Sequence, residues 1–194
     1  MTDKRFTKIR NVVEKRQKNF TIVLENIHDP HNVSAILRSA DAVGIDKVFL
    51  IYNTNKFPKI GKTSSGSAKK WISLEKFNNV KDCFYELKSR KYKIYSTYLS
   101  EHKKNYSLYD LNLTRKIALV FGNEHTGVSE EVKEMSDRNF MIPMYGMIQS
   151  LNVSVAVAMS LYEAMREKEL KGKYVRSDYK KLELNEKINN YINR

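Results

Sequence analysis

Apolar positions follow two different periods along the chain, and the change of period predicts strands and helices in alternation. Short apolar runs typical of buried strands occupy residues 20–27, 47–52, 92–99, 116–121 and 139–144. Apolar residues at helical spacing occupy residues 29–44, 80–91, 129–135 and 147–165. Because strands that alternate with helices form parallel sheets, the pattern predicts an α/β domain with helices on both faces of the sheet.

The two ends of the chain differ from this central pattern. Residues 1–19 are rich in basic side chains and place apolar residues at helical spacing, which predicts an amphipathic basic helix. After Tyr162 the last long helix becomes charged, and the tail that follows it is polar. We therefore expect residues 1–19 and 166–194 to be basic helical extensions of one domain that spans residues 20–165.

The helix expected at 29–44 carries its own start and stop signals. Asp29 can cap the first turn, Pro30 fits that turn, and Gly44 can end the helix. Arg38 falls nearly opposite the apolar stripe of this helix. Its guanidinium is therefore either an ordinary solvated charge or a group held in place to bind a phosphate.

Polar side chains gather in three loops that follow predicted strands, at 25–32, 122–127 and 145–152. Ligands of open parallel sheets usually bind beyond the carboxyl ends of the strands, so these loops are the candidate site. Gly122 directly follows a buried strand, which favours either a close approach of backbone to a ligand or a plain glycine turn. Glu124 can cap the next helix or bind a hydrogen-bond donor.

The segment 147–165 is long, apolar and nearly uncharged in an otherwise basic chain. We expect Ser150 to cap its helix and Asn152 to lie in the first turn, near free backbone N–H groups. The apolar residues expected to pack inward are Leu151, Val155, Met159 and Tyr162. Polar side chains beyond a single cap indicate either a polar helix start or the mouth of a ligand site.

Charge is the most informative bulk property of the chain. Lysine and arginine number 35 against 22 aspartate and glutamate residues, which gives a net charge of +13. A field of this sign attracts phosphate backbones, so the balance favours a nucleic-acid partner unless a lysine-rich composition alone explains it.

Other classes of protein are excluded by what the sequence lacks. The single cysteine, Cys83, excludes an internal disulfide and a cysteine-rich metal site, and we expect no metal. No run approaches the roughly 20 apolar residues of a membrane span, and the first residues lack the apolar region of a signal peptide. Neither a Rossmann glycine motif nor a P-loop is present. We therefore expect a cytoplasmic protein with no membrane partner.

Three segments, taken in order, resemble the three motifs of the SPOUT superfamily of RNA methyltransferases. They are HNVSAILRSADAVG with Asn32 and Arg38, LVFGNEHTGVS with Glu124, and IPMYGMIQSLNVSVAVAMSLYEA with Ser150 and Asn152. The likeness runs nearly the whole length of the chain. It is strongest to the branch of the superfamily that methylates the 2′-hydroxyl of guanosine in tRNA.

This resemblance implies a fold and a cofactor that the residue pattern alone does not predict. Members of the superfamily have a parallel sheet whose C-terminal part is threaded into a trefoil knot, and they are typically homodimers. The knot loops bind S-adenosylmethionine, and the apolar face of the last motif helix would belong to the knot and the dimer interface. By resemblance the cofactor pocket of this chain is lined by Gly122, Ile142, Leu151 and Thr97, the last of which is expected after its strand.

The implied reaction is 2′-O-methylation of guanosine 18 in the D-loop of tRNA. By resemblance Arg38 is the catalytic residue and acts with the neighbouring phosphate. A guanidinium holds its proton at neutral pH, so Arg38 can equally clamp the phosphate and stabilise the developing alkoxide while phosphate or water takes the proton. Asn32 would orient Arg38 or the ribose. Glu124, Ser150 and Asn152 would hold the pocket and the adjacent loops.

The expected RNA contacts are basic positions that match those of relatives. They are Arg10, Arg16, Lys69, Arg166, Lys168 and Arg176. Relatives often carry arginine where Lys168 stands, and lysine lacks the planar fork that binds a phosphate through two hydrogen bonds. The implied partner is tRNA, and no DNA is expected.

Two other functions fit the same resemblance. One is 2′-O-methylation of ribosomal RNA, although relatives of that kind often carry a separate N-terminal RNA-binding domain. The other is a non-catalytic RNA-binding protein on the same fold. The presence of all five expected catalytic residues argues against the second alternative.

Overall fold

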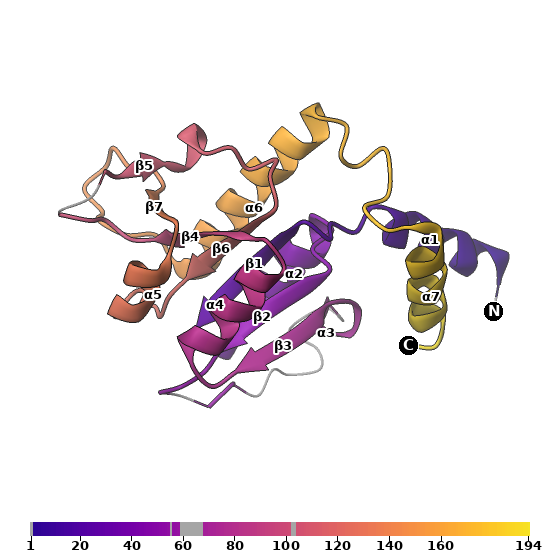
Figure 1. Cartoon of the computed structure of the whole chain (residues 1–194), viewed down its shortest axis with the longest axis horizontal. Coiled ribbons are helices and arrows are strands. Elements are labelled where there is room, and N and C mark those ends of the chain that lie inside the picture. The colour runs from indigo at the N-terminus through magenta and orange to yellow at the C-terminus, as the bar shows by residue number, and fades with distance from the viewer. Residues whose placement is uncertain (1, 55, 59–67, 102–103) are drawn as a thin grey trace.

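A computed structural model describes residues 2–54, 56–58, 68–101 and 104–194. In this part of the chain seven strands form one parallel sheet in the order β3-β2-β1-β6-β4-β7-β5 (Figure 1). The strands are β1 (Phe20–Glu25), β2 (Lys47–Ile51), β3 (Ser73–Phe77), β4 (Lys93–Thr97), β5 (Tyr106–Ser107), β6 (Ile117–Phe121) and β7 (Arg138–Met141). The parallel sheet predicted from the sequence is therefore confirmed.

Helices cover both faces of this sheet, as predicted. They are α1 (Asp3–Glu14), α2 (Pro30–Ala42), α3 (Ala68–Trp71), α4 (Val80–Ser89), α5 (Glu130–Met135), α6 (Val153–Leu170) and α7 (Lys181–Ile192), with a 3₁₀ turn at Leu108–Asp110. Successive side chains of a strand point to opposite faces, so Ile22 and Leu24 join one core and Val23 joins the other. α2 and α6 pack against the first core, and α4 and α5 pack against the second.

Local sequence signals explain where several helices begin and end. The Asp29 carboxylate caps α2 by accepting a hydrogen bond from the backbone N–H of His31, 2.8 Å away, and Pro30 is the first helical residue. Gly44 lies just beyond the end of α2 with φ of +81°, a conformation that glycine adopts without strain. Ser129 caps α5 in the same manner as Asp29 caps α2.

The start and the orientation of α6 differ from the prediction. Asn152, not Ser150, is the cap, and its side-chain oxygen accepts from the backbone N–H of Ser154 at 2.8 Å. Leu151 packs against the first core, but the other three residues expected to pack inward are exposed: Val155 by 46%, Met159 by 38% and Tyr162 by 49%. The buried stripe of α6 faces α2 and the sheet and consists of Val157, Ser160, Leu161, Ala164 and Lys168.

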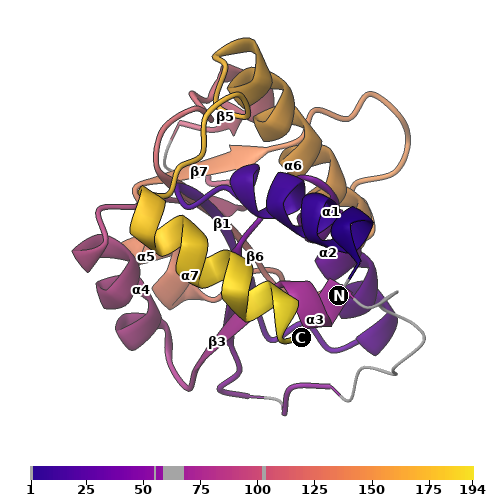
Figure 2. The ribbon, with the colours of Figure 1, turned by 90° about the vertical axis from the view of Figure 1, so that its right-hand side faces the viewer.

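The two terminal helices lie side by side at one end of the molecule (Figures 1 and 2). A small third core joins them, formed by Ile9 and Val13 of α1 with Ile188 and Tyr191 of α7. The expected N-terminal helix at 1–19 ends at Glu14. The boundary expected after residue 165 falls inside the continuous helix α6, while the wider division into three parts stays a prediction.

Strand order and parallel pairing fit the expected SPOUT architecture. The trefoil knot depends on how the chain threads through its own loops, so the knot stays a prediction. Among the described residues no helix is long and apolar enough to cross a membrane.

Candidate active site

The sheet register brings the candidate loops to one edge. Ser96 of β4 pairs with Val120 of β6, and Thr97 pairs with Phe140 of β7. Because all these strands are parallel, the residues that follow them emerge together at the carboxyl edge. The loops after β1, β6 and β7 therefore converge, as the sequence predicted.

A hydrogen-bonded cluster joins the three loops. The Glu124 carboxylate accepts from the side chain of Asn32 at 2.9 Å, and from the backbone N–H groups of His28 at 3.1 Å and Asp29 at 3.3 Å. The side-chain oxygen of Asn32 in turn accepts from the side-chain amide of Asn152 at 3.1 Å. One residue from each motif thus takes part in a continuous network across the edge of the sheet.

The charge on Glu124 is stabilised by this network. Burial by itself would raise the pKa of its carboxyl group, but the hydrogen bonds from Asn32 and from backbone N–H groups outweigh burial, so the pKa lies below the ordinary value. An ionised Glu124 holds the start of α2 against the loop after β6. The expected alternative that Glu124 caps the next helix is wrong, because Ser129 caps α5.

The loop after β6 is closed by its own backbone. Asn123 and Gly127 exchange backbone hydrogen bonds of 3.0 and 2.9 Å, and the side chain of Asn123 donates to the carbonyl oxygen of Asn26 at 2.8 Å. A Cβ atom on Gly122 would lie 2.1 Å from the carbonyl carbon of Gly127. Gly122 is therefore required by the turn itself, which is the second of the two readings of this glycine. Sequence reasoning missed Asn123, although asparagine favours turns because its side chain can accept from the backbone two residues on, as Asn123 does from the N–H of His125 at 2.9 Å.

Arg38 lies apart from this cluster within one chain. It is exposed on α2 and has no hydrogen bond or ion pair with any residue that the structure describes. Six residues separate it from Asn32, a rise of about 9 Å along the helix axis. The expectation that Asn32 orients Arg38 is not met here, since the side chain of Asn32 is held by Glu124 and Asn152. The guanidinium of Arg38 is free to meet a ligand.

The segment 144–150 between β7 and α6 is exposed throughout. Ser150 and Gln149 lie here, outside the helix, and neither joins the cluster. The segment also exposes large apolar side chains, with Tyr145 at 98%, Met147 at 100% and Ile148 at 63%. Ser150 is therefore outside the hydrogen-bonded network of Asn32, Glu124 and Asn152 in the part of the chain that the structure describes, although the resemblance suggested one group.

The residues expected to line the cofactor pocket lie at the ends of adjacent strands. Thr97 is the last residue of β4 rather than a residue beyond it, and its hydroxyl donates to the carbonyl oxygen of Val120 at 3.2 Å. Ile142 is buried just after β7, and Leu151 is half-buried against the first core. Together with Gly122 they place apolar side chains and strand-end backbone at the same edge as the cluster.

A cavity of about 690 Å³ opens beside the cluster, at the carboxyl ends of β1, β2 and β6. His28 belongs to both the cavity wall and the cluster, and the neighbours of Glu124 in its loop, Asn123 and 125–127, line the same wall. Glu25 lies at the inner wall, almost fully buried, and accepts from the backbone N–H of Ser129 at 2.9 Å. The described residues contain no group of three or more histidine, cysteine, aspartate or glutamate side chains arranged to hold a metal ion.

Two of the expected RNA-binding residues are buried, which corrects their assignment as surface contacts. Arg16 is 1% exposed; its guanidinium donates to the carbonyl oxygen of Ile45 at 2.8 Å and pairs with Asp41. Lys168 is also 1% exposed and lies 5.3 Å from the ring centroid of Phe20. Burial lowers the pKa of Lys168 to about 8.

The other four expected RNA contacts lie on the surface. Lys69 and Arg176 are exposed. Arg10 pairs with Glu14 of its own helix α1 at 2.8 Å, and Arg166 pairs with Glu163 of its own helix α6 at 2.7 Å. Both arginine side chains are exposed. Lys168 follows Leu161 and Ala164 at helical spacing, which indicates a position on the buried face of the helix. The prediction relied on the charge of Lys168 and overlooked this spacing.

Comparison with known proteins places this geometry in a family. Residues 19–162 match the model of the SpoU rRNA Methylase family. The tRNA (guanosine(18)-2′-O)-methyltransferase of Aquifex aeolicus is 41% identical over 174 residues, which cover 90% of this chain and 82% of the relative. The enzyme of the same name from Escherichia coli strain K12 is 35% identical over 178 residues, covering 92% of this chain and 76% of the relative.

A solved structure agrees over almost the whole chain. The crystal structure of the Aquifex aeolicus TrmH/SpoU tRNA modifying enzyme superposes with a TM-score of 0.90 at 38% identity, and covers 97% of this chain and 95% of the other. The likeness therefore includes the terminal helices as well as the sheet. The chain belongs to the SpoU methylase family of RNA methyltransferases.

Proposed function

We propose that this protein transfers a methyl group from S-adenosylmethionine to the 2′-hydroxyl of guanosine 18 in tRNA. The network that joins Asn32, Glu124 and Asn152 across three loops is the observation that carries the proposal. A protein that only bound RNA would need exposed basic side chains, but not a polar network that ties three loops together at a strand edge. Relatives named for this reaction match this chain over 90% and 92% of its length.

The residues at the strand ends fit the proposed cofactor. Ile142 and Leu151 offer apolar surface to the faces of an adenine ring, and strand-end backbone groups can pair with its edge. S-adenosylmethionine, when bound, supplies an electrophilic methyl group on a sulfonium centre. Thr97 already donates to Val120, so its part is to fix the wall rather than to bind through that hydroxyl proton.

Arg38 is the proposed catalytic residue, and its chemistry favours one of two roles. A guanidinium keeps its proton at neutral pH, which makes it a poor general base. It can hold the phosphate next to the target ribose through two hydrogen bonds and stabilise the alkoxide as the 2′-hydroxyl loses its proton. The phosphate or a water molecule then accepts that proton.

Asn32, Glu124 and Asn152 act as positioning residues in this proposal. Glu124 accepts from the backbone N–H groups of His28 and Asp29, just before α2, and Asn32 ties the first turn of α2 to the cap of α6. The network thus fixes where α2 starts and, through the rigid helix, where Arg38 stands. Ser150 lies in the exposed segment and would contact the loops or the substrate only once a partner covers it.

A second copy of the chain is the proposed partner of α6. Val155, Met159 and Tyr162 follow one another at helical spacing and form an exposed apolar stripe, here called the outer face of α6. The exposed apolar residues of 144–150 adjoin the start of this helix. Burying such a patch against an identical one would form a symmetric dimer beside the strand-end site.

The proposed RNA contacts are the exposed basic residues Arg10, Lys69, Arg166 and Arg176. They would neutralise backbone phosphates of tRNA, which we expect the protein to meet in the cytoplasm. Ribosomal RNA is the competing substrate, since the family's name refers to it. The names of the two relatives above favour tRNA.

Transfer of labelled methyl groups to purified RNA tests the proposal. The protein is incubated with labelled S-adenosylmethionine and either bulk tRNA or ribosomal RNA, and the modified nucleotide is mapped. We expect label in tRNA at guanosine 18, and none in a transcript that carries 2′-deoxyguanosine at that position. Label in ribosomal RNA alone would establish the competing substrate, and no label in either RNA would refute the enzymatic proposal.

A further inference from the structure

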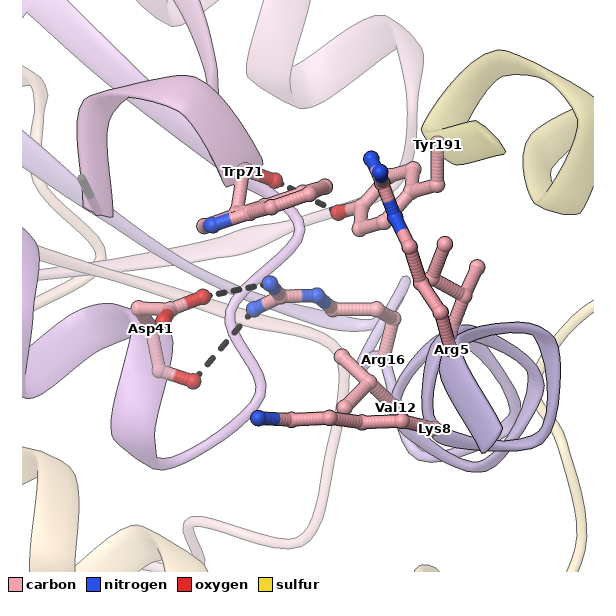
Figure 3. A pocket seen from close by; sticks show the side chains of 8 residues that line it. Arg5, Lys8, Val12, Arg16, Asp41, Trp71 and Tyr191 are labelled. Atoms are coloured by element: carbon pink, nitrogen blue, oxygen red, sulfur yellow. Dashed lines mark hydrogen bonds and ion pairs between the residues drawn. The ribbon is translucent and has the colours of Figure 1, made fainter. Parts of the chain in front are cut away.

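A separate cavity of about 380 Å³ lies between the terminal helices and the far end of α2 (Figure 3). Asp41 in its wall is nine residues beyond Asn32, which corresponds to about 13 Å along the helix axis. The other walls come from α1, from Trp71 at the end of α3, and from Tyr191 of α7. Methyl transfer as proposed above uses none of these residues.

The inner wall of this terminal cavity is rigid and charged. The buried guanidinium of Arg16 donates to the carbonyl oxygen of Ile45 and pairs with Asp41, so two elements hold it in place. Its Nε–H group is buried without a hydrogen-bond partner among the described residues. The carbon at the centre of the guanidinium lies 5.7 Å from the ring centroid of Tyr191.

Two aromatic rings form a second wall. Trp71 and Tyr191 pack with ring centroids 5.4 Å apart and planes tilted by 34°. The hydroxyl of Tyr191 donates to the backbone carbonyl of Trp71, which fixes the two side chains relative to each other. Tyr191 is buried, whereas the indole of Trp71 is only half-buried and offers part of its surface to the cavity.

Two unpaired cations stand at the rim. Arg5 and Lys8 of α1 are exposed, and neither side chain has a carboxylate partner among the described residues. Figure 3 shows Lys8 extending alongside Arg16 and Arg5 rising toward Tyr191. Arg10 on the same helix differs, because its charge is paired with Glu14. The rim cations are thus available to an anionic ligand.

We propose that this terminal cavity binds one unpaired nucleotide of RNA, with its base against Trp71 and its phosphate at Arg5 and Lys8. An aromatic surface flanked by free cations is the combination that holds single-stranded RNA, since bases stack on rings while phosphates pair with basic side chains. The volume suits one nucleotide and is too small for a base pair. The inference goes beyond the proposed reaction, because it gives the terminal helices a binding pocket of their own.

Trp71 makes the cavity directly observable, because it is the only tryptophan in the chain. Its fluorescence is recorded while the full-length protein is titrated with nucleoside 5′-monophosphates or a short unstructured RNA oligonucleotide, with correction for their absorbance. Inorganic phosphate and ribose 5-phosphate serve as probes that lack a base. We expect saturable quenching by the nucleotides and the oligonucleotide, and neither quenching nor competition by the two probes without a base.

A matched pair of double variants locates the binding. Arg5→Ala/Lys8→Ala removes the rim cations, and we expect roughly tenfold weaker nucleotide binding from the loss of two exposed phosphate contacts. Lys4→Ala/Lys181→Ala removes the same charge from exposed positions on α1 and α7 outside the cavity, and we expect a change of less than about twofold.

Three outcomes would overturn the inference: no quenching, equal weakening in both double variants, or displacement of nucleotide by inorganic phosphate, which would mean a simple anion site. The result is independent of the proposed reaction. Arg38→Ala, which should not transfer methyl groups, is expected to show the same quenching as the parent protein. Failure of methyl transfer and failure of nucleotide binding are therefore distinguishable.

Discussion

Two neighbouring regions at the carboxyl edge of the sheet differ in how their side chains are satisfied. The cluster of Asn32, Glu124 and Asn152 pairs its polar groups within one chain. The segment 144–150 and the outer face of α6 leave large apolar side chains in contact with solvent. Water disfavours exposed apolar surface, whereas a paired polar network has one preferred arrangement.

This difference indicates that one part of the site is positioned by a single chain and that another part is completed only by a second copy. One chain is sufficient to fix the cluster and hence the course of α2. The segment that contains Ser150 has no such hydrogen-bonded network with the residues that the structure describes, so we expect a second copy to order it. Changes in the cluster should therefore alter the stability of the single chain, while changes in the outer face of α6 should alter association.

The largest effect is expected at Arg38, which neither region holds. In Arg38→Ala the developing alkoxide loses its cationic partner, and we expect methyl transfer to fall by about 10³-fold. Affinity for S-adenosylmethionine should stay nearly unchanged, because Arg38 is exposed on α2, whereas the expected cofactor wall of Thr97, Ile142 and Leu151 belongs to other elements. Turnover is measured with labelled cofactor, and cofactor binding by calorimetry. Retained turnover would remove Arg38 from the mechanism.

The next largest effect is expected on the outer face of α6, where a second copy of the chain is proposed to bind. Met159→Glu places a charge in the middle of the outer face of α6, where burial against an identical face would require a desolvated carboxylate. We expect the dimer to dissociate at micromolar protein concentration, with loss of methyl transfer, as measured by sedimentation and the labelled-methyl assay. Leu170→Glu is the matched control, since Leu170 is 73% exposed at the end of the same helix. A monomeric parent protein, or a dimeric Met159→Glu variant, would contradict the proposed interface.

A smaller effect is expected within the cluster of Asn32, Glu124 and Asn152. Glu124→Gln turns an acceptor of three N–H groups into a partial donor, and we expect the free energy of unfolding to fall by about 2 kcal/mol. The folded pKa of Glu124 is lowered, so its contribution is present above the unfolded pKa of a carboxyl group and is lost as pH falls through the lowered value. The stability of the Glu124→Gln variant should therefore lack the part of the decrease at acidic pH that comes from protonation of Glu124.

Urea denaturation at a series of pH values measures both effects of Glu124→Gln. Glu134→Gln provides the control, because Glu134 is exposed on the neighbouring helix α5. If the two variants unfold at the same urea concentration at neutral pH, the hydrogen bonds of Glu124 do not hold the loops together.

Where the signals were local, the sequence predicted the structure well. Asp29, Pro30 and Gly44 each act at the helix end where the sequence placed them. The buried strands followed from their apolar runs, and the order of motifs along parallel strands predicted that the loops would meet. Strands β3 and β5 were missed, since one is only partly buried and the other has two residues.

Side-chain direction was the part that the sequence did not predict. Ser150 and Asn152 were both candidate caps for α6. The choice of Ser150 led to the wrong prediction that Val155 and Met159 face inward, whereas Asn152 is the cap and both residues are exposed. Arg16 was read as a surface charge, but it lies beyond the end of α1, where helical phase no longer applies. Its burial depends on Asp41 of α2, a long-range contact that no local pattern contains.

The smallest expected effect compares exposed with buried basic residues in the C-terminal part. If Arg166 and Arg176 each neutralise one tRNA phosphate, the double alanine variant should reduce the slope of log binding constant against log salt concentration by up to about 2. Arg166 is already paired with Glu163, so part of its contribution is offset in the free protein. Lys168→Met removes the same kind of charge from a buried position and should leave the slope unchanged.

Binding of tRNA over a series of potassium chloride concentrations gives all three slopes. Equal slopes for the parent and the double variant would mean that Arg166 and Arg176 are solvated surface charges, and a shallower slope for Lys168→Met would mean that the buried ammonium reaches the RNA.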